Sequence, residues 1–144
     1  MLNIKNKGLE LLKSGEASCI VIKDEKIIHT ANGKGVKPLK DLLEDNPDFM
    51  RGTFVIDEII GKAAAILLVL GHVKKVYGDM ISDSAYNYLI QKGVEVEYNK
   101  RVKNICNKSG DDICPLEKSV LEIDDPKVAF EAIKKTIKEL MTAV

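Results

Sequence analysis

The segment from Gly61 to Leu70 constrains the fold more than any other, because it is apolar nearly all round. A helix without a polar face belongs inside a layered fold rather than on a surface. β-rich runs lie on either side of it, over 53–57 and 74–81. A helix over 83–91 and a strand over 94–98 continue the alternation. We therefore expect parallel neighbouring strands joined by crossover helices.

The first third of the chain predicts a different arrangement. Residues 1–14 predict a short helix, and Gly15 is placed to end it. Residues 17–23 and 26–31 are β-rich runs separated by Asp24-Glu25, which is typical of a hairpin. The first of these two strands is apolar on both faces, so we expect layers to cover both of its sides.

The rest of the chain predicts further helices, near 38–45, 115–122 and 126–142, with a polar loop over 99–113. No repeat, low-complexity stretch or linker interrupts the pattern. Apolar residues make up 45% of the chain, enough for a substantial core. We expect residues 1–144 to form a single α/β domain.

Composition narrows the classes of partner. Charged residues cancel to a net charge of zero and aromatic residues make up 5%, so we expect no nucleic-acid partner. The longest apolar run, Ala63 to Leu70, is too short to cross a membrane. The N-terminus lacks the apolar stretch of a secretory signal, and the three cysteines are odd in number. These features predict a cytoplasmic protein with reduced thiols.

Four stretches, spread over roughly residues 8–132, have the order and spacing of a known family. They are Gly15-Glu16-Ala17-Ser18-Cys19, Gly35-Val36-Lys37-Pro38-Leu39, Ile60-Gly61-Lys62-Ala63-Ala64-Ala65 and Cys114-Pro115-Leu116-Glu117. On these stretches the chain resembles the domain-of-unknown-function 1893 family of prokaryotes. The resemblance implies a cytidine-deaminase-like fold: three α/β/α layers and a mixed sheet of about five strands with an N-terminal hairpin. It implies no established activity. Domains of this fold commonly assemble, so a homodimer is one expectation.

The zinc chemistry of deaminases does not carry over with the fold. Such an enzyme needs H-x-E or C-x-E on one helix and P-C-x-x-C at the start of the next. The corresponding places here read Gly61-Lys62-Ala63-Ala64 and Ser82-Asp83-Ser84-Ala85. Neither offers a His or Cys ligand. We therefore expect no catalytic metal at that place and no other cofactor.

Gly61 and Lys62 form the most suggestive pair. They open the apolar helix directly after a strand, and a helix N-terminus attracts anions through its free N–H groups. Lys62 is also locally misplaced, because the helix dipole disfavours a cation at that end. A phosphate or carboxylate ligand would suit both residues. The structural alternative is an ion pair of Lys62 with Asp57 or Glu58.

Three further polar residues belong to the same expected region. Asp57 follows the strand predicted over 53–56, and ligands of open α/β sheets bind beyond the carboxyl ends of strands. It is a candidate base or ligand contact; the alternative is a cap for the next helix. Ser82 is a good N-cap, and Ser84 follows it. In a deaminase-like layout this helix start and the one at Gly61 would converge on one electropositive hollow. The Gly33-Lys34-Gly35 turn is a weaker candidate for wrapping a phosphate.

Cys114 and Glu117 form a separate candidate site. The order Cys114-Pro115-Leu116-Glu117 imitates a capping box, with Pro115 in the first helical position and Glu117 reaching back to position 114. A helix start favours the thiolate, so Cys114 is a candidate nucleophile or redox thiol; the alternative is a simple helix start. Two other options involve Cys106: a disulfide with Cys114, or a metal site shared with His29 or His72. The spacing matches no known zinc knuckle.

Three hypotheses for function follow. The first is a zinc-free domain that binds a small anionic or nucleotide-like ligand through Asp57, Gly61, Lys62, Ser82 and Ser84. The second is a zinc-independent enzyme that uses Lys62 and Asp57 as acid and base, or Cys114 as nucleophile. The third is an interaction module whose pocket is filled by its own core.

Overall fold

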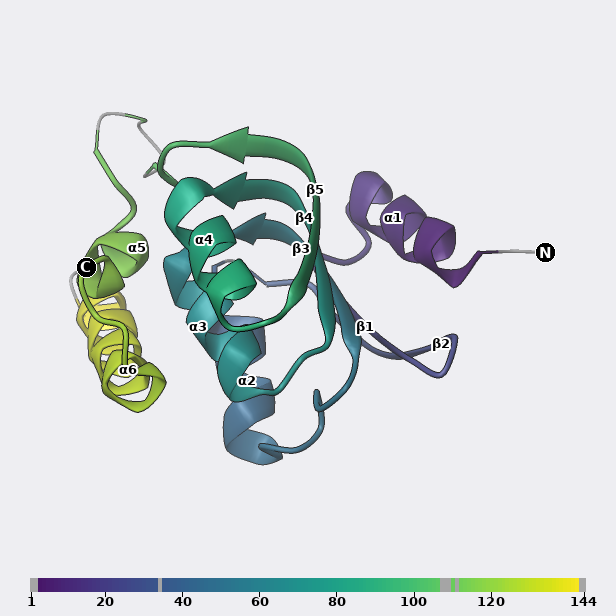
Figure 1. Cartoon of the computed structure of the whole chain (residues 1–144), viewed down its shortest axis with the longest axis horizontal. Helices are drawn as coiled ribbons and strands as arrows, with labels where there is room; N and C mark the ends of the chain where they lie inside the picture. Colours follow the sequence, from purple (N-terminus) through teal and green to yellow (C-terminus); the bar gives the residue numbers. More distant parts are fainter. Residues whose placement is uncertain (1–2, 34, 107–109, 111, 143–144) are drawn as a thin grey trace.

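A computed structural model describes residues 3–33, 35–106, 110 and 112–142 of the chain. Its strands and helices alternate in the expected order (Figure 1). They are α1 (Ile4–Ser14), β1 (Cys19–Lys23), β2 (Lys26–Ala31), α2 (Lys37–Asp45), β3 (Phe54–Ile60), α3 (Lys62–Leu70), β4 (Lys75–Ser82), α4 (Asp83–Gln91), β5 (Glu95–Val102), α5 (Pro115–Val120) and α6 (Pro126–Thr142).

One mixed sheet of five strands organises the molecule. Its strand order is β2-β1-β3-β4-β5. The N-terminal hairpin is confirmed: β1 runs antiparallel to β2, and the turn residues Asp24 and Glu25 both have positive φ, as two-residue hairpin turns require. β1 is also antiparallel to β3, whereas β3, β4 and β5 are parallel. The expected α/β class and mixed sheet are confirmed.

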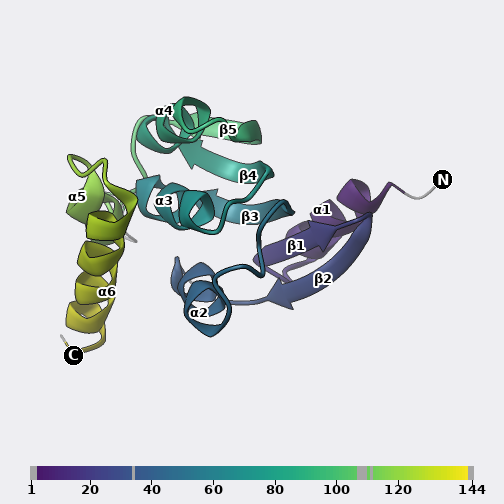
Figure 2. The ribbon, with the colours of Figure 1, turned by 60° about the horizontal axis from the view of Figure 1, so that its bottom comes forward.

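Helices cover the two faces of the sheet unequally. α1 lies alone on one face, and α2, α3 and α4 lie on the other (Figure 2). Side chains of β1 alternate accordingly: Ile20 and Ile22 pack toward α1, whereas Cys19 and Val21 join the larger core around α3. The prediction that this strand is covered on both sides is confirmed. Three layers in this strand order are consistent with a cytidine-deaminase-like fold.

α3 is the centre of the larger core. Its residues from Lys62 to Leu68 are buried, because the sheet covers one side and α6 packs on the outer side. α5 packs on both α3 and α6, so the C-terminal helices close the molecule beyond α3 (Figure 1). The interior position predicted from an all-apolar helix is confirmed. None of the helices in the described part of the chain combines the length and apolar character needed to span a bilayer.

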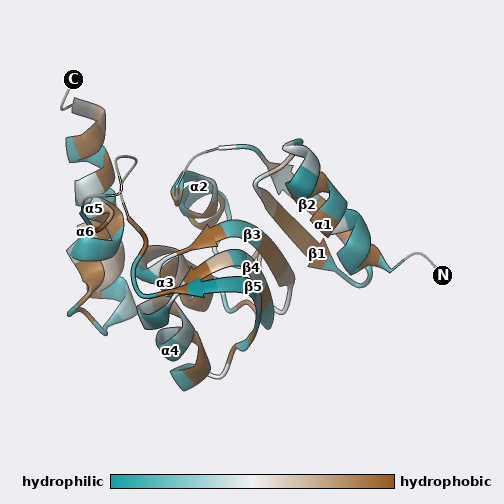
Figure 3. Cartoon of the chain, turned by 90° about the horizontal axis from the view of Figure 1, so that it is seen from above, coloured by the Kyte–Doolittle hydropathy of each residue, from teal (hydrophilic) through white to brown (hydrophobic). Residues whose placement is uncertain are grey.

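Two strands are longer than the sequence pattern predicts. β3 continues to Ile60, and β5 continues to Val102 because its ladder with β4 extends to the pair Ser82–Val102. β5 forms an edge of the sheet and is largely hydrophilic, unlike β1 (Figure 3). A polar edge strand gives no apolar pattern from which to predict its end. The extension of β3 places Asp57 inside a strand, which corrects its predicted position after one.

Candidate functional site

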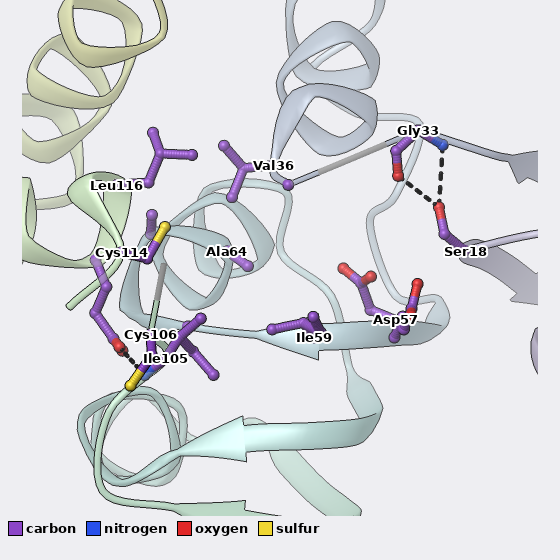
Figure 4. A pocket seen from close by; sticks show the side chains of 15 residues that line it. Ser18, Gly33, Val36, Asp57, Ile59, Ala64, Ile105, Cys106, Cys114 and Leu116 are labelled. Atoms are coloured by element: carbon purple, nitrogen blue, oxygen red, sulfur yellow. Dashed lines mark hydrogen bonds between the residues drawn. The ribbon is translucent and has the colours of Figure 1, made fainter. Parts of the chain in front are cut away.

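A cavity of about 380 Å³ lies beside β3 and the start of α3. Gly33 and Val36, which lie between β2 and α2, border it, and Ile105 and Cys106, which follow β5, lie across from them (Figure 4). Most of its wall is apolar, including Val36, Ile59, Ala64, Ile105 and Leu116. Two of the residues predicted to contact a ligand, Asp57 and Gly61, also line it. The cavity therefore lies beside the junction of β3 and α3.

Asp57 contributes the buried carboxyl group of this wall. It lies in the middle of three strands, paired with Cys19 of β1 and Gly78 of β4, and is 7% exposed. Burial raises its pKa from the ordinary 3.8 to about 7, and the charge of Glu58 acts in the same direction. The backbone N–H groups of Glu58 and Ile59 oppose the shift. Near neutral pH both protonation states of Asp57 are populated.

The surroundings of Asp57 exclude one predicted role. α3 begins at Lys62 with Gly61 as its N-cap, and the backbone N–H of Lys62 donates to the carboxylate of Glu117 and not to Asp57. The alternative that Asp57 caps this helix is therefore wrong. Within the described residues, no side chain donates a hydrogen bond to Asp57, although its carboxyl faces the cavity (Figure 4). The capacity to accept hydrogen bonds that the backbone N–H groups of Glu58 and Ile59 leave unused is available to a ligand.

Glu117 occupies the expected meeting point of two helix N-termini. It is 2% exposed, and its carboxylate accepts hydrogen bonds from the backbone N–H of Lys62 at 3.1 Å and from the hydroxyl of Ser84 at 3.0 Å. The hydroxyl of Ser82 and the backbone N–H of Ile105 donate to it as well. The helix starts of α3 and α4 thus converge as predicted, and a carboxylate from the chain's own α5 takes the place of an anionic ligand.

This arrangement corrects the predicted capping box. Glu117 does not reach back to Cys114, whose N–H donates instead to the carbonyl of Ile105 at 2.8 Å. Pro115 does open α5 as predicted, and Ser82 caps α4 by accepting from the N–H of Ala85 at 3.2 Å. The capping rule failed at Glu117 because stronger partners, two helix N-termini far away in the sequence, compete for the same carboxylate.

The donor set around Glu117 does not fit a catalytic zinc ion. Zinc takes imidazole, thiolate and carboxylate ligands, usually three of them from the protein in an enzyme. Here the groups that converge are backbone N–H groups, two serine hydroxyls and one carboxylate. Across the described residues, no group of three or more His, Cys, Asp or Glu is arranged to hold a metal.

Lys62 points away from the cavity. Its amine donates to the carbonyl of Leu121 at 2.7 Å and lies 3.7 Å from the carboxylate of Asp124. The predicted alternative, a pair with Asp57 or Glu58, is wrong. The carbonyl of Leu121 lies at the C-terminal end of α5, where the helix dipole favours a cation. Lys62 and Glu117 together therefore fasten α5 to the start of α3. Neither Lys62 nor the predicted contacts Ser82 and Ser84 line the cavity.

The cysteines divide between the core and the cavity. Cys19 is buried, and burial raises the pKa of its thiol, with Asp57 adding to the effect. Cys106 and Cys114 both line the cavity and are free. Cys106 pairs across a β-bridge with Ile113, and the backbone N–H of Cys114 donates to the carbonyl of Ile105, so the two cysteines are not directly opposite each other. That register disfavours the disulfide considered from the sequence.

Ser18, Gly33 and Gly35 belong to the wall. The glycine turn was a weak candidate from the sequence, and Ser18 was not predicted. The hydroxyl of Ser18 donates to the carbonyl of Gly33 at 2.9 Å and accepts from its N–H at 3.1 Å (Figure 4). These bonds fix the turn beside the cavity, which Gly35 also lines. Lys34, the charged member of the predicted phosphate turn, lies outside the described residues. The apolar wall residues carry no signal that distinguishes them from ordinary core.

Comparisons with known proteins show similarity over most of the chain. Residues 7–137 match a family described as a domain of unknown function (DUF1893). A solved DUF1893 family protein from Thermotoga maritima is similar over 96% of this chain and 91% of its own, with 27% identity and a TM-score of 0.81. A diaminohydroxyphosphoribosylaminopyrimidine deaminase/5-amino-6-(5-phosphoribosylamino)uracil reductase of the same organism is similar over 82% of this chain and 40% of its own, with 16% identity and a TM-score of 0.45. No curated protein matches the chain.

Proposed function

The chain belongs to the DUF1893 family of domains of unknown function, and from this premise we propose that it is a small-molecule-binding domain. The observation that carries the proposal is the cavity of about 380 Å³ with the buried carboxyl of Asp57 in its wall. Ligand sites in proteins are mostly apolar hollows of roughly 300–1,000 Å³ with a few placed polar groups. A buried carboxyl with a strongly raised pKa in such a hollow is typical of a functional site.

The position of the ligand differs from the one first expected. The helix N-termini that would have bound an anion are occupied by Glu117, so the ligand lies in the adjoining cavity instead. Asp57 and Gly61 keep their proposed contacts. Lys62, Ser82 and Ser84 act indirectly, by holding Glu117 and α5 in the positions that shape the wall.

A screen of small molecules by thermal shift tests the proposal. A ligand at about 100 times its dissociation constant should stabilise the fold by roughly 2.7 kcal/mol. We expect hits whose effect disappears in Ala64→Leu, which fills the cavity, and weakens in Ile59→Trp, which adds bulk at an exposed part of its wall. Ile28→Trp on β2 is the matched control, because Ile28 is 38% exposed and does not line the cavity. Hits that bind equally well to all three variants would place binding elsewhere.

A second candidate function is general acid–base catalysis by Asp57, which its pKa near neutrality favours. The amine of Lys62 is held at Leu121, so it is not the partner in this version. A ligand found in the screen that is slowly converted by the wild type and not by Asp57→Asn would support this candidate. Conversion that persists in Asp57→Asn would assign the chemistry to another group, with Cys114 next in line because it also faces the cavity.

A further inference from the structure

The charged groups of the cavity wall all have the same sign. Asp57, Glu58 and Glu117 supply three carboxyl groups, and none of the described lining residues is a lysine, arginine or histidine. A pocket for a phosphate or carboxylate normally offers basic side chains or free N–H groups. The described part of the wall therefore favours a ligand that donates hydrogen bonds over an anion.

The three carboxyl groups differ in what they can still bind. Glu117 already accepts hydrogen bonds from four donors of its own chain. Glu58 is exposed, and its charge acts on Asp57 through space. Asp57 is buried, faces the cavity and receives no bond from a described side chain. A ligand that enters the cavity can therefore donate hydrogen bonds to Asp57, and the negative charge of Glu58 lies nearby.

The apolar part of the wall strengthens this preference. Ile59, Ala64 and Leu116 come from β3, α3 and α5 and line the same cavity as Asp57 (Figure 4). Hydrogen bonds to a charged group become stronger where water is excluded, and an unpaired charge of the wrong sign becomes more costly. A compact apolar molecule with hydrogen-bond donors on one edge would pack against the apolar residues and donate to Asp57.

We propose that the cavity binds a compact, largely apolar molecule that presents two neighbouring N–H donors to Asp57, as in an amidine, a guanidine or an amino-substituted nitrogen heterocycle. The ionised form of Asp57, together with Glu58, repels carboxylates and phosphates. This inference rests on the proposed function. It replaces the anionic ligand that was expected from the sequence. Asp57 is the specificity-determining group, because it is the acceptor that such an edge pairs with.

Three probes of one shape test the inference: benzamidine, benzamide and benzoate. They share a ring and differ only in the group that would face Asp57. Dissociation constants are measured by ligand-observed NMR titration on the full chain. We expect benzamidine to bind at least tenfold tighter than benzoate, a margin of about 1.4 kcal/mol, with benzamide between them. The preference for benzamidine should disappear in Asp57→Asn and persist in Asp79→Asn, which removes a carboxylate of β4 that does not line the cavity.

The outcomes separate the inference from the function on which it rests. Benzoate binding as tightly as benzamidine, with both signals lost in Ala64→Leu, would overturn the inference and leave the cavity as a ligand site. An unchanged benzamidine preference in Asp57→Asn would overturn it as well. No binding signal from any of the three probes would count against the inference. Binding of all three probes that persists in both Ala64→Leu and Ile59→Trp would also count against it, and it would contradict the cavity as the ligand site. If a variant fails to fold, benzoate binding to the wild type as tightly as benzamidine still overturns the inference.

Discussion

At the scale of single residues, two buried carboxyl groups have opposite situations. Glu117 is surrounded by donors, whereas Asp57 has a raised pKa because it is buried in an apolar wall. A carboxyl that folding deprives of water destabilises the folded state whenever it is ionised. A carboxyl that folding provides with several donors stabilises it. The two residues should therefore respond in opposite directions to replacement by the uncharged amide.

Asp57→Asn should stabilise the protein above neutral pH. The pKa of Asp57 rises from 3.8 to about 7 on folding, so between these values the folded chain holds a proton that the unfolded chain has lost. Wild-type stability therefore falls as pH rises from about 4 to about 7, and the penalty is complete above that. At pH 8 the variant should gain up to about 4 kcal/mol in free energy of unfolding, and near pH 4 the gain should vanish. Urea unfolding at both pH values, with Asp79→Asn as control, measures this; an equal effect at both pH values would contradict it.

Glu117→Gln should destabilise the protein strongly. The substitution keeps the shape of the side chain but removes the charge and turns one acceptor into a donor, facing the N–H of Lys62 and the hydroxyls of Ser82 and Ser84. We expect a loss of about 2–4 kcal/mol. Glu122→Gln, an exposed position just beyond α5, should change stability by less than about 0.5 kcal/mol. Equal urea midpoints for the two variants would contradict the assignment of Glu117 as an internal anion.

At the scale of elements, helix α5 depends on contacts with α3. Its six residues, Pro115–Val120, are too few to be stable alone. Glu117 binds the start of α3 near one end of α5, and Lys62 binds the carbonyl of Leu121 at the other. A short helix held at both ends by one neighbouring helix is stable only as part of the assembled fold.

Lys62→Met should therefore loosen α5 locally. Methionine keeps the apolar stem of the side chain and removes the amine that binds Leu121 and lies near Asp124. Relief of the cost of burying a charge partly offsets the lost bond, so we expect a global loss of only about 1–2 kcal/mol. Amide hydrogen exchange in α5 should become faster while exchange in β4 changes little. Lys118→Met, at an exposed position of α5, is the control and should leave amide exchange in α5 unchanged. Equal exchange rates in the two variants would contradict the proposal that Lys62 holds α5 against α3.

Elements were predictable where burial left a pattern in the chain. The all-apolar composition of 61–70 placed α3 in the interior, and the hairpin of β1 and β2 followed from two β-rich runs and a two-residue turn. The ends of β3 and β5 were not predictable, because pairing with β4 decides them. Asp57 and Gly61 were found by their place near the strand–helix junction. Most hydrogen-bond partners of Glu117 and Lys62 were missed because they lie 33 to 59 residues away in the sequence.

At the scale of the whole molecule, the sheet joins two cores. Ile20 and Ile56 pack under α1 on one face, while Val21 and Val55 pack with α3 on the other. These residues alternate along the same two strands. Loss of either core would therefore expose one face of the strands whose other face forms the second core. The cavity lies in the larger core, between β3, α3 and α5, and its shape depends on this shared frame.

This coupling predicts that the chain unfolds as one cooperative unit, as the single-domain expectation requires. The ring of Tyr88 on α4 is 3% exposed, and its hydroxyl donates to the carbonyl of Asp124 at 3.3 Å, so tyrosine fluorescence reports in part on the packing of the C-terminal helices. Far-ultraviolet circular dichroism reports on all helices. Because the two cores share their strands, the two signals should give coincident urea transitions with one midpoint and one slope. An earlier fluorescence transition would mean that α5 and α6 detach first, and the cavity would then open before the sheet melts. Tyr88→Phe, which removes the hydroxyl and keeps the ring packing, should lower the midpoint measured by circular dichroism and leave the transition a single step, because the lost bond belongs to the one cooperative unit.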